Sequence, residues 1–167
     1  IQQKLEAYLR LGDVSNWQAR YSDALEYYSA MLKLAEESGD LIAQARALSA
    51  CANTHGFQGD NHASLENAMR AETLARNADA KIEVARSLWM QGTARFRVGA
   101  SHAALTLAEQ ALADFTALND QDEMARCLNL QAAVYYVSGM FDKAESSWEN
   151  ALKIFQELGN RHQGMDV

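Results

Sequence analysis

Three arginines recur along the chain at equal intervals: Arg46, Arg86 and Arg126. A guanidinium group can donate two parallel hydrogen bonds to one carboxylate, so arginines in equal phase suit a partner with acidic side chains or a free C-terminus. Glu83 and Glu123 each lie three residues before an arginine, a spacing that on a helix allows an ordinary ion pair within that helix. Both interpretations stay open from the sequence.

The other reactive side chains form no catalytic or metal-binding pattern. The four histidines lack ligand spacing to one another or to a cysteine, and His55 is expected to be a partly buried structural residue. The sequence contains no glycine-rich phosphate loop and no nucleophile elbow. Cys51 and Cys127 fall among apolar residues, which is typical of reduced thiols in a cytoplasmic protein. We therefore expect no enzyme activity, no metal and no cofactor.

The net charge of the 167-residue chain is -7 at pH 7. Nucleic-acid modules normally carry a clustered basic face, so we expect no nucleic-acid binding in this segment. No apolar run approaches the roughly 18 residues that a membrane span needs, and we expect no membrane contact. The overall charge favours basic or neutral partners, whereas the arginine row favours acidic groups.

The whole sequence repeats without an insertion, and its period of about 40 residues lies in the range of helical-repeat proteins. Gly59, Gly99 and Gly139 coincide in phase, and each follows one amphipathic pattern and precedes a second. Glycine adopts the left-handed conformation at little cost, so we expect the first helix of each pair to end there. A unit of this length cannot bury its apolar face by itself, and the copies are expected to stack into an all-α solenoid.

The predicted copies are residues 1–40, 41–80, 81–120 and 121–160, and residues 161–167 are expected to begin a truncated fifth copy of a single array, 1–167. Helix stop and start residues mark the ends of the four copies: Gly39-Asp40, Asp79-Ala80, Asn119-Asp120 and Gly159-Asn160. Asp120 followed by Glu123 predicts a capping box, in which the two side chains bind amide groups of the new helix.

Small and large residues follow one pattern in every copy, which the fourth copy carries as Leu128, Ala132, Tyr135, Gly139, Phe141, Ala144, Trp148 and Ala151. This pattern resembles the tetratricopeptide repeat and implies a right-handed superhelix of antiparallel helix pairs. The usual repeat of that family has about 34 residues and a proline near its end, whereas this repeat is longer and the chain has no proline. It is similar to the long repeats of bacterial regulators, which include maltose-regulator-like activators and multidomain signalling ATPases, cyclases and kinases. Similar long repeats occur in kinesin light chains and spindle-orientation adaptors.

In this family the first helix of each pair lines a concave groove. The resemblance implies that six residues face a partner there: Arg46, Asn53, Arg86, Trp89, Arg126 and Asn129. A tryptophan on a groove wall is a common binding anchor, but tryptophan in a helical array also packs in the core. The two asparagines can hold an extended peptide backbone or stand as ordinary solvated residues. A carboxylate clamp like that of some family members is not expected, because Asp13 would repel the carboxylate.

The leading hypothesis is a non-catalytic, cytoplasmic scaffold that binds a protein or peptide, including partners with acidic groups, and belongs to a larger bacterial regulatory or signalling protein. The alternative is a segment of a transcriptional activator that senses a ligand or peptide. The unfinished fifth copy also predicts self-association through an uncapped C-terminal end.

Overall fold

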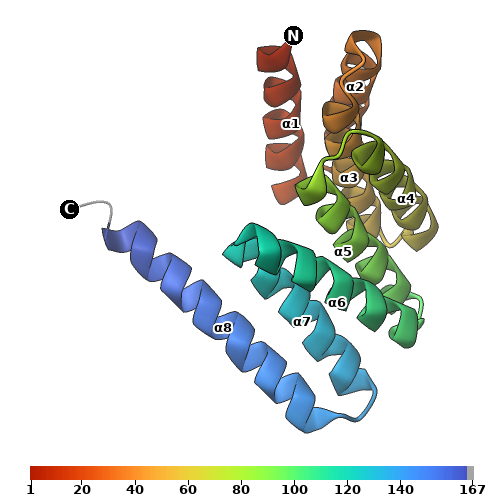
Figure 1. The fold of residues 1–167 in the computed structure, drawn as a ribbon. Coiled ribbons are helices and arrows are strands. Elements are labelled where there is room, and N and C mark those ends of the chain that lie inside the picture. The colour runs from red at the N-terminus through yellow and green to blue at the C-terminus, as the bar shows by residue number, and fades with distance from the viewer. Residues whose placement is uncertain (165–167) are drawn as a thin grey trace.

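The structure is a computed structural model that describes the backbone of residues 1–164 and the side chains of residues 1–159. This part of the chain forms eight helices: α1 (Gln2–Trp17), α2 (Tyr21–Ser38), α3 (Leu41–Gln58), α4 (Asn61–Asn77), α5 (Lys81–Arg97), α6 (Ser101–Leu118), α7 (Gln121–Val137) and α8 (Phe141–Gly164). They form four antiparallel pairs in chain order, and each pair stacks on the next (Figure 1). The predicted all-α solenoid is confirmed.

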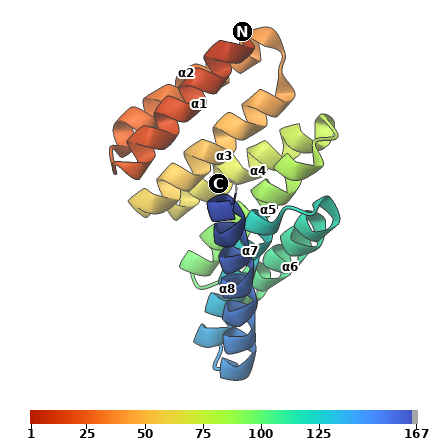
Figure 2. The same ribbon diagram turned by 90° about the vertical axis from the view of Figure 1, so that its left-hand side faces the viewer.

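Helix starts follow the sequence period. The second helices of the pairs begin at Tyr21, Asn61, Ser101 and Phe141, with the same spacing as the recurring arginines and glycines. The direction of the pairs changes progressively, so that α1 and α2 run in a different direction from α7 and α8 (Figures 1 and 2). None of the described helices is long and apolar enough to cross a membrane.

The C-terminal helix differs from the expectation. A helix break was predicted at Gly159-Asn160, but α8 continues without interruption to Gly164. Residues 161–164 therefore belong to α8, and residues 165–167 of the expected fifth copy lie outside the described residues. The predicted division into four copies and the beginning of a fifth stays a prediction.

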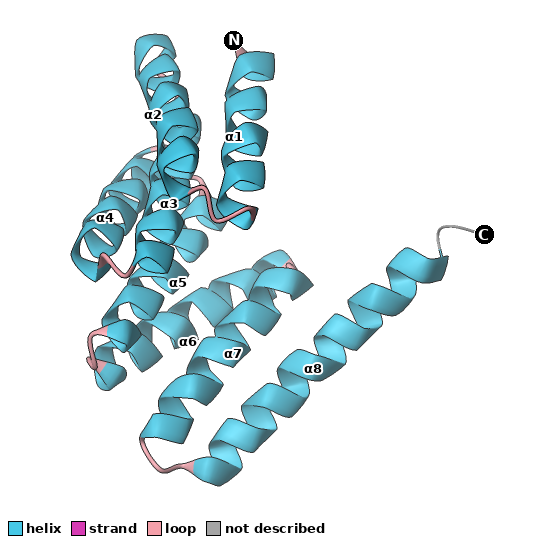
Figure 3. Ribbon diagram, turned by 180° about the vertical axis from the view of Figure 1, so that it is seen from behind, coloured by secondary structure: helices cyan, strands magenta, loops and turns pink. Residues whose placement is uncertain are grey.

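Short turns join the helices, and their geometry explains the glycine pattern (Figure 3). Gly59, Gly99 and Gly139 have φ angles of 82, 81 and 74°, as expected for residues that end a helix in the left-handed conformation. At the corresponding position of the first pair, Ala19 has a φ of 57°. The alanine carries a Cβ atom that this conformation disfavours.

Aspartates begin three of the helices. The side chains of Asp40, Asp60 and Asp120 accept hydrogen bonds from the backbone amides three residues further on, at 2.9, 3.0 and 3.3 Å. Only half of the predicted capping box forms, because the Glu123 carboxylate accepts a hydrogen bond from Arg86 instead. The prediction of Asp120 as the capping residue is therefore confirmed, whereas Glu123, its expected partner, binds Arg86 of α5 instead.

Close packing within the pairs depends on small residues. A side chain at Gly12 would overlap the ring of Tyr28, which is buried between α1 and α3. The odd-numbered helices also contact one another, α1 with α3, α3 with α5 and α5 with α7, whereas no two even-numbered helices of the described chain are in contact. The odd-numbered helices thus lie closer together and line the inner side of the stack.

Candidate functional site

A groove of about 450 Å³ lies on the inner side of the stack. Eleven of its twelve lining residues come from the odd-numbered helices, and Tyr28 reaches it from α2. The residues are Leu9, Asp13, Asn16, Trp17, Tyr28, Arg46, Ser49, Ala50, Asn53, Arg86, Met90 and Arg126. The groove therefore spans all four helix pairs and combines charged, amide, hydroxyl and aromatic groups.

Alternating charges cross the groove from α3 to α7. Arg46 Nε donates to Glu83 Oε1 at 2.7 Å, and Arg86 Nη1 donates to Glu83 Oε2 at 2.8 Å. Arg86 Nε then donates to Glu123 Oε1 at 3.2 Å, while Arg126 Nε lies 3.8 Å from Glu123 Oε2. We call these five residues the charge ladder. The pairing of Glu83 with Arg86 is the ion pair within one helix that the sequence allowed, and the bonds to Arg46 and Glu123 join separate repeats.

The middle of the ladder is removed from solvent. The Glu83 side chain is 2% exposed, and a buried carboxylate is tolerated because charged donors occupy both of its oxygens. Burial would lower the pKa of the Arg86 guanidinium, but the carboxylates of Glu83 and Glu123 outweigh it and raise that pKa above its ordinary value. Arg86 thus stays positively charged and already donates hydrogen bonds to two carboxylates.

The ends of the ladder remain available. The side chains of Arg46 and Arg126 are 48% and 50% exposed. Arg126 Nε donates to Asp122 Oδ2 at 3.1 Å, and among the described residues neither arginine uses its Nη groups in a hydrogen bond. Both can therefore donate paired hydrogen bonds to a carboxylate that enters the groove.

One hydroxyl group in the groove lacks a partner. Ser49 is 2% exposed, and its Oγ makes no hydrogen bond to any described residue. A buried polar atom without a partner costs about 1–3 kcal/mol, so such an atom in the lining of a groove indicates a group that a ligand would satisfy. The half-buried Asn53 lies one helical turn further along the same face of α3.

At the α1 end of the groove an acidic residue is held in place. The Tyr28 hydroxyl donates to Asp13 Oδ1 at 2.8 Å. Burial, and then the hydrogen bond and the charge of Asp13, raise the pKa of Tyr28 well above its ordinary value. The tyrosine therefore stays a donor at neutral pH, and the groove carries a carboxylate at this end and arginines towards α7.

The structure brings four of the six predicted site residues together, because Arg46, Asn53, Arg86 and Arg126 all line the groove. Trp89 does not line it: its half-buried ring packs between α5, α6 and α7, and its Nε1 donates to the carbonyl of Arg126 at 3.3 Å. Asn129 lies apart from the groove, in an apolar hollow between α7 and α8. Of the predicted site residues, those on α3 and the arginine on α5 thus line the groove, whereas on α7 Arg126 lines it and Asn129 does not.

Eight groove residues lie outside the predicted set, and three of them, Ser49, Trp17 and Asp13, offer groups that a ligand could contact. Ser49 occupies the same phase as Trp89 and Asn129, which is the one signal that could have marked it, but its unpartnered hydroxyl appears only in the structure. Trp17 is the most exposed large apolar residue of the described chain, at 84%, and it lines the groove near Asp13. No spacing rule distinguishes Trp17 from a core tryptophan.

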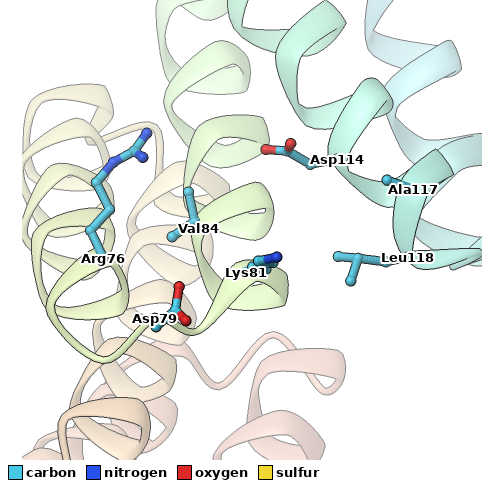
Figure 4. Close-up of a pocket in the computed structure, with 7 residues that line it drawn as sticks. All are labelled: Arg76, Asp79, Lys81, Val84, Asp114, Ala117 and Leu118. Atoms are coloured by element: carbon cyan, nitrogen blue, oxygen red, sulfur yellow. The ribbon is translucent and has the colours of Figure 1, made fainter.

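A second hollow, of about 530 Å³, lies beside the turn between α4 and α5 (Figure 4). Lys81 and Val84 of α5 lie between Arg76 and Asp79 on one side and the α6 residues Asp114, Ala117 and Leu118 on the other. Arg76 already pairs with Glu72 at 2.7 Å. Two acidic and two basic side chains leave this hollow without a dominant charge, and none of its lining residues is an unpartnered buried polar group.

The cysteines are buried and free, as expected. Burial raises the pKa of the Cys51 thiol to about 11 and that of the Cys127 thiol to about 12, so neither is a thiolate at neutral pH. Among the residues that the structure describes, no group of three or more His, Cys, Asp or Glu side chains could hold a metal ion.

No model of a known protein family matches the sequence, and no curated protein matches it. Solved structures do resemble the fold. One is BtubC (BKLC) from P. vanneervenii, with 21% identity, a TM-score of 0.74, and coverage of 93% of this chain and 64% of that one. Another is a Rap protein complexed with Competence and Sporulation Factor, with 17% identity, a TM-score of 0.84, and coverage of 93% and 43%.

A third similar structure is aspartyl phosphate phosphatase F from Bacillus subtilis, with 16% identity, a TM-score of 0.81, and coverage of 94% of this chain and 41% of that one. The chain thus spans between 41% and 64% of the length of these structures. At these identities the likeness establishes the fold, which is a tetratricopeptide-like helical-repeat solenoid. Such a scaffold is consistent with protein or peptide binding.

Proposed function

We propose that this chain is a non-catalytic scaffold that binds a protein or peptide segment in the groove formed by α1, α3, α5 and α7. Within a larger bacterial regulatory or signalling protein, it would recognise a segment that carries an acidic side chain or a free C-terminal carboxylate. The observation that carries the proposal is the unpartnered, buried Ser49 hydroxyl, which lies in the same groove as the free Nη groups of Arg46 and Arg126.

The chemistry of the groove fits a polypeptide. Ser49 can bond a backbone carbonyl or amide, and the Asn53 amide can both donate and accept, as an extended backbone requires. The Nη groups at either end of the charge ladder supply paired donors for a carboxylate. Trp17 offers an exposed ring on which an apolar side chain can pack.

Known structures of this fold support a binding role. One similar structure, at 17% identity, is a Rap protein complexed with Competence and Sporulation Factor. That complex belongs to the Rap protein as a whole, and the identity of its factor carries no information about the partner of this chain. Because the chain spans only 43% of that protein, we propose binding and not the activity of the whole molecule.

The experiment is selection of random short peptides, with free C-termini, on the immobilised chain, followed by fluorescence anisotropy with the enriched peptides. We expect enrichment of acidic residues or of a C-terminal carboxylate. Ser49→Ala and Arg126→Ala should each weaken binding about fivefold or more, since one hydrogen bond contributes about 1 kcal/mol.

Arg76→Ala is the matched control for Arg126→Ala. Both arginines are about half exposed and both pair with an acidic residue four positions earlier on their own helix, but Arg76 lies on α4, away from the groove. Binding should be unaffected by Arg76→Ala. Failure to enrich any peptide, or equal effects of the two substitutions, would contradict the proposal.

A further inference from the structure

The groove carries opposite charges at its two ends. Arg46 and Arg126 lie near the beginning of α3 and of α7, whereas Asp13 lies near the end of α1. The Tyr28 hydroxyl donates to Asp13 Oδ1 at 2.8 Å, and no described residue donates a hydrogen bond to Asp13 Oδ2. Tyr28 therefore holds the Asp13 carboxylate in position and leaves one of its oxygens for a ligand.

Asp13 faces the groove because of its phase in the repeat. It corresponds to Asn53, Thr93 and Ala133, and all four residues are half-buried. Asn53 lines the same groove although the α1–α2 pair precedes it. A helix pair in front of α1 would therefore leave Asp13 open to the groove in the same way. Arg46 also lies inside the array, with helix pairs on both sides, and its side chain is 48% exposed.

The two charged ends are separated by the length of a short extended peptide. Equal phase places Asp13 level with Asn53, which lies seven residues after Arg46. Seven residues of helix correspond to about 10 Å, and the contacting helices α1 and α3 lie about 8–10 Å apart, so Asp13 and Arg46 are about 14 Å apart in backbone position. Residues four positions apart in an extended chain are about 13 Å apart and point to the same side. One extended segment can therefore reach both ends.

The balance of charges in the groove favours a ligand of mixed charge. The three arginines stand against the carboxylates of Asp13, Glu83, Asp122 and Glu123. A ligand with acidic groups alone would bring further negative charge towards Asp13, whereas a basic group at that end would pair with it. Between the two ends, Ser49 and Asn53 of α3 offer a hydroxyl and an amide to a peptide backbone.

We propose that the groove selects a segment of mixed charge, in which Asp13 binds a lysine or arginine side chain four positions away from the carboxylate that Arg46 binds. This inference rests on the function proposed above and adds a second charged group at a stated spacing. Asp13 attracts the basic side chain and repels a carboxylate, so it also determines which way round the segment lies in the groove.

The test repeats the selection of random peptides on the unaltered chain and on the Asp13→Asn chain. On the unaltered chain we expect lysine or arginine to be enriched four positions from the enriched carboxylate. On Asp13→Asn that basic enrichment should disappear, whereas the acidic enrichment should remain because Arg46 is unchanged. The asparagine keeps an oxygen that accepts from Tyr28, so this variant should fold, which circular dichroism verifies.

Fluorescence anisotropy then measures the coupling between the two groups. Each enriched peptide is compared with a copy in which glutamine replaces the basic residue. On the unaltered chain the copy should bind about fivefold or more weakly, and on Asp13→Asn the two peptides should bind equally. Asp114→Asn is the matched control, because it also removes one carboxylate but lies on α6 beside the second hollow. It should distinguish the two peptides as the unaltered chain does.

The outcomes separate this inference from the function on which it rests. Acidic enrichment without basic enrichment, or an equal effect of the glutamine copy on the unaltered and Asp13→Asn chains, overturns the inference and leaves the proposed function standing. Basic enrichment without a fixed spacing would indicate a general attraction to an acidic chain and would overturn the inference equally. If no acidic residue or C-terminal carboxylate is enriched, both fail.

Discussion

The charge ladder makes a specific prediction for stability, because Glu83 of α5 is the residue that joins α3 to α5 electrostatically. Its carboxylate is 2% exposed and accepts one charged hydrogen bond from α3 and one from its own helix. Glu83→Gln keeps the shape of the side chain but removes its charge and places an amide NH₂ group against a guanidinium donor. Both arginines then lose a charged acceptor, and the amide has one unmatched donor.

The expected cost follows from these contacts. A hydrogen bond to a charged group contributes about 1.5–3 kcal/mol, but Arg46 is half exposed and regains water, and Arg86 keeps Glu123. We therefore expect a loss of about 2–3 kcal/mol, which for a chain of this size lowers Tm by about 5–10 °C. Arg46→Ala should cost about 1–3 kcal/mol, because it leaves the buried Glu83 Oε1 without its charged donor while Oε2 keeps its bond to Arg86.

Urea denaturation followed by circular dichroism measures the effect, with Glu26→Gln on the exposed surface of α2 as the control. A double-mutant cycle for Arg46 and Glu83 should give a coupling energy of about 1 kcal/mol. If Glu83→Gln were as stable as Glu26→Gln, or if the cycle gave no coupling, the ladder would not join α3 to α5 energetically. The account of the buried carboxylate would then be wrong.

Four other substitutions test the packing, one turn and one helix cap. Ala19→Gly should stabilise the chain by about 0.5–1 kcal/mol in thermal unfolding, because residue 19 has a φ of 57° that glycine adopts more easily; a loss of stability would contradict this. Gly12→Ala should destabilise by about 1–3 kcal/mol through overlap with the buried Tyr28 ring. Gly56→Ala, whose added Cβ would overlap only the far end of the flexible Arg97 side chain, should cost less, and the reverse order would count against the packing argument. Asp40→Ala should cost about 1 kcal/mol at pH 7. The backbone amide of Ala43 lowers the pKa of Asp40, so this contribution is present above pH of about 4 and declines as the pH falls through the lowered pKa. Denaturation at pH 7 and at strongly acid pH should therefore show a smaller gap between the two proteins in acid, and an unchanged gap would refute the assignment.

Most of the fold could be predicted because the same residue types recur at the same positions of each repeat. Glycine in fixed phase marks where the first helices end, and aspartate marks where α3, α4 and α7 begin. The end of α8 could not be predicted in the same way. Gly39, Asp79 and Asn119 each precede a helix that packs back on the pair, whereas no helix follows α8 in the described residues to hold a turn at Gly159. A helix break of this kind depends on tertiary contacts as well as on the local residue.

The candidate site was predictable only in part, for a geometric reason. Equal phase places Arg46, Arg86 and Arg126 on one face, but it does not show which acidic residue each of them meets. In the structure, Arg46 bonds Glu83 and Arg86 bonds Glu123, and both pairs are separated by 37 residues. That separation joins adjacent repeats because neighbouring inner helices cross at a close distance, which the sequence does not encode locally. The position of Trp89 was open for the same reason, since packing against α6 and α7 determines whether its ring faces the groove.

The ladder also reconciles an acidic chain with an acidic ligand. The net charge of -7 is spread over the whole molecule, and at physiological salt a charge is screened beyond about 8 Å. Around the groove the three arginines stand against four carboxylates, those of Glu83, Glu123, Asp13 and Asp122, so the local sum is not positive. What favours a carboxylate ligand is the pair of exposed donors on Arg46 and Arg126. Glu83 and Glu123 hold the arginines in place while they leave the outer Nη groups unused. The carboxylates of the ladder thus orient its donors towards a ligand, and the overall charge of the chain has little influence on what the groove binds.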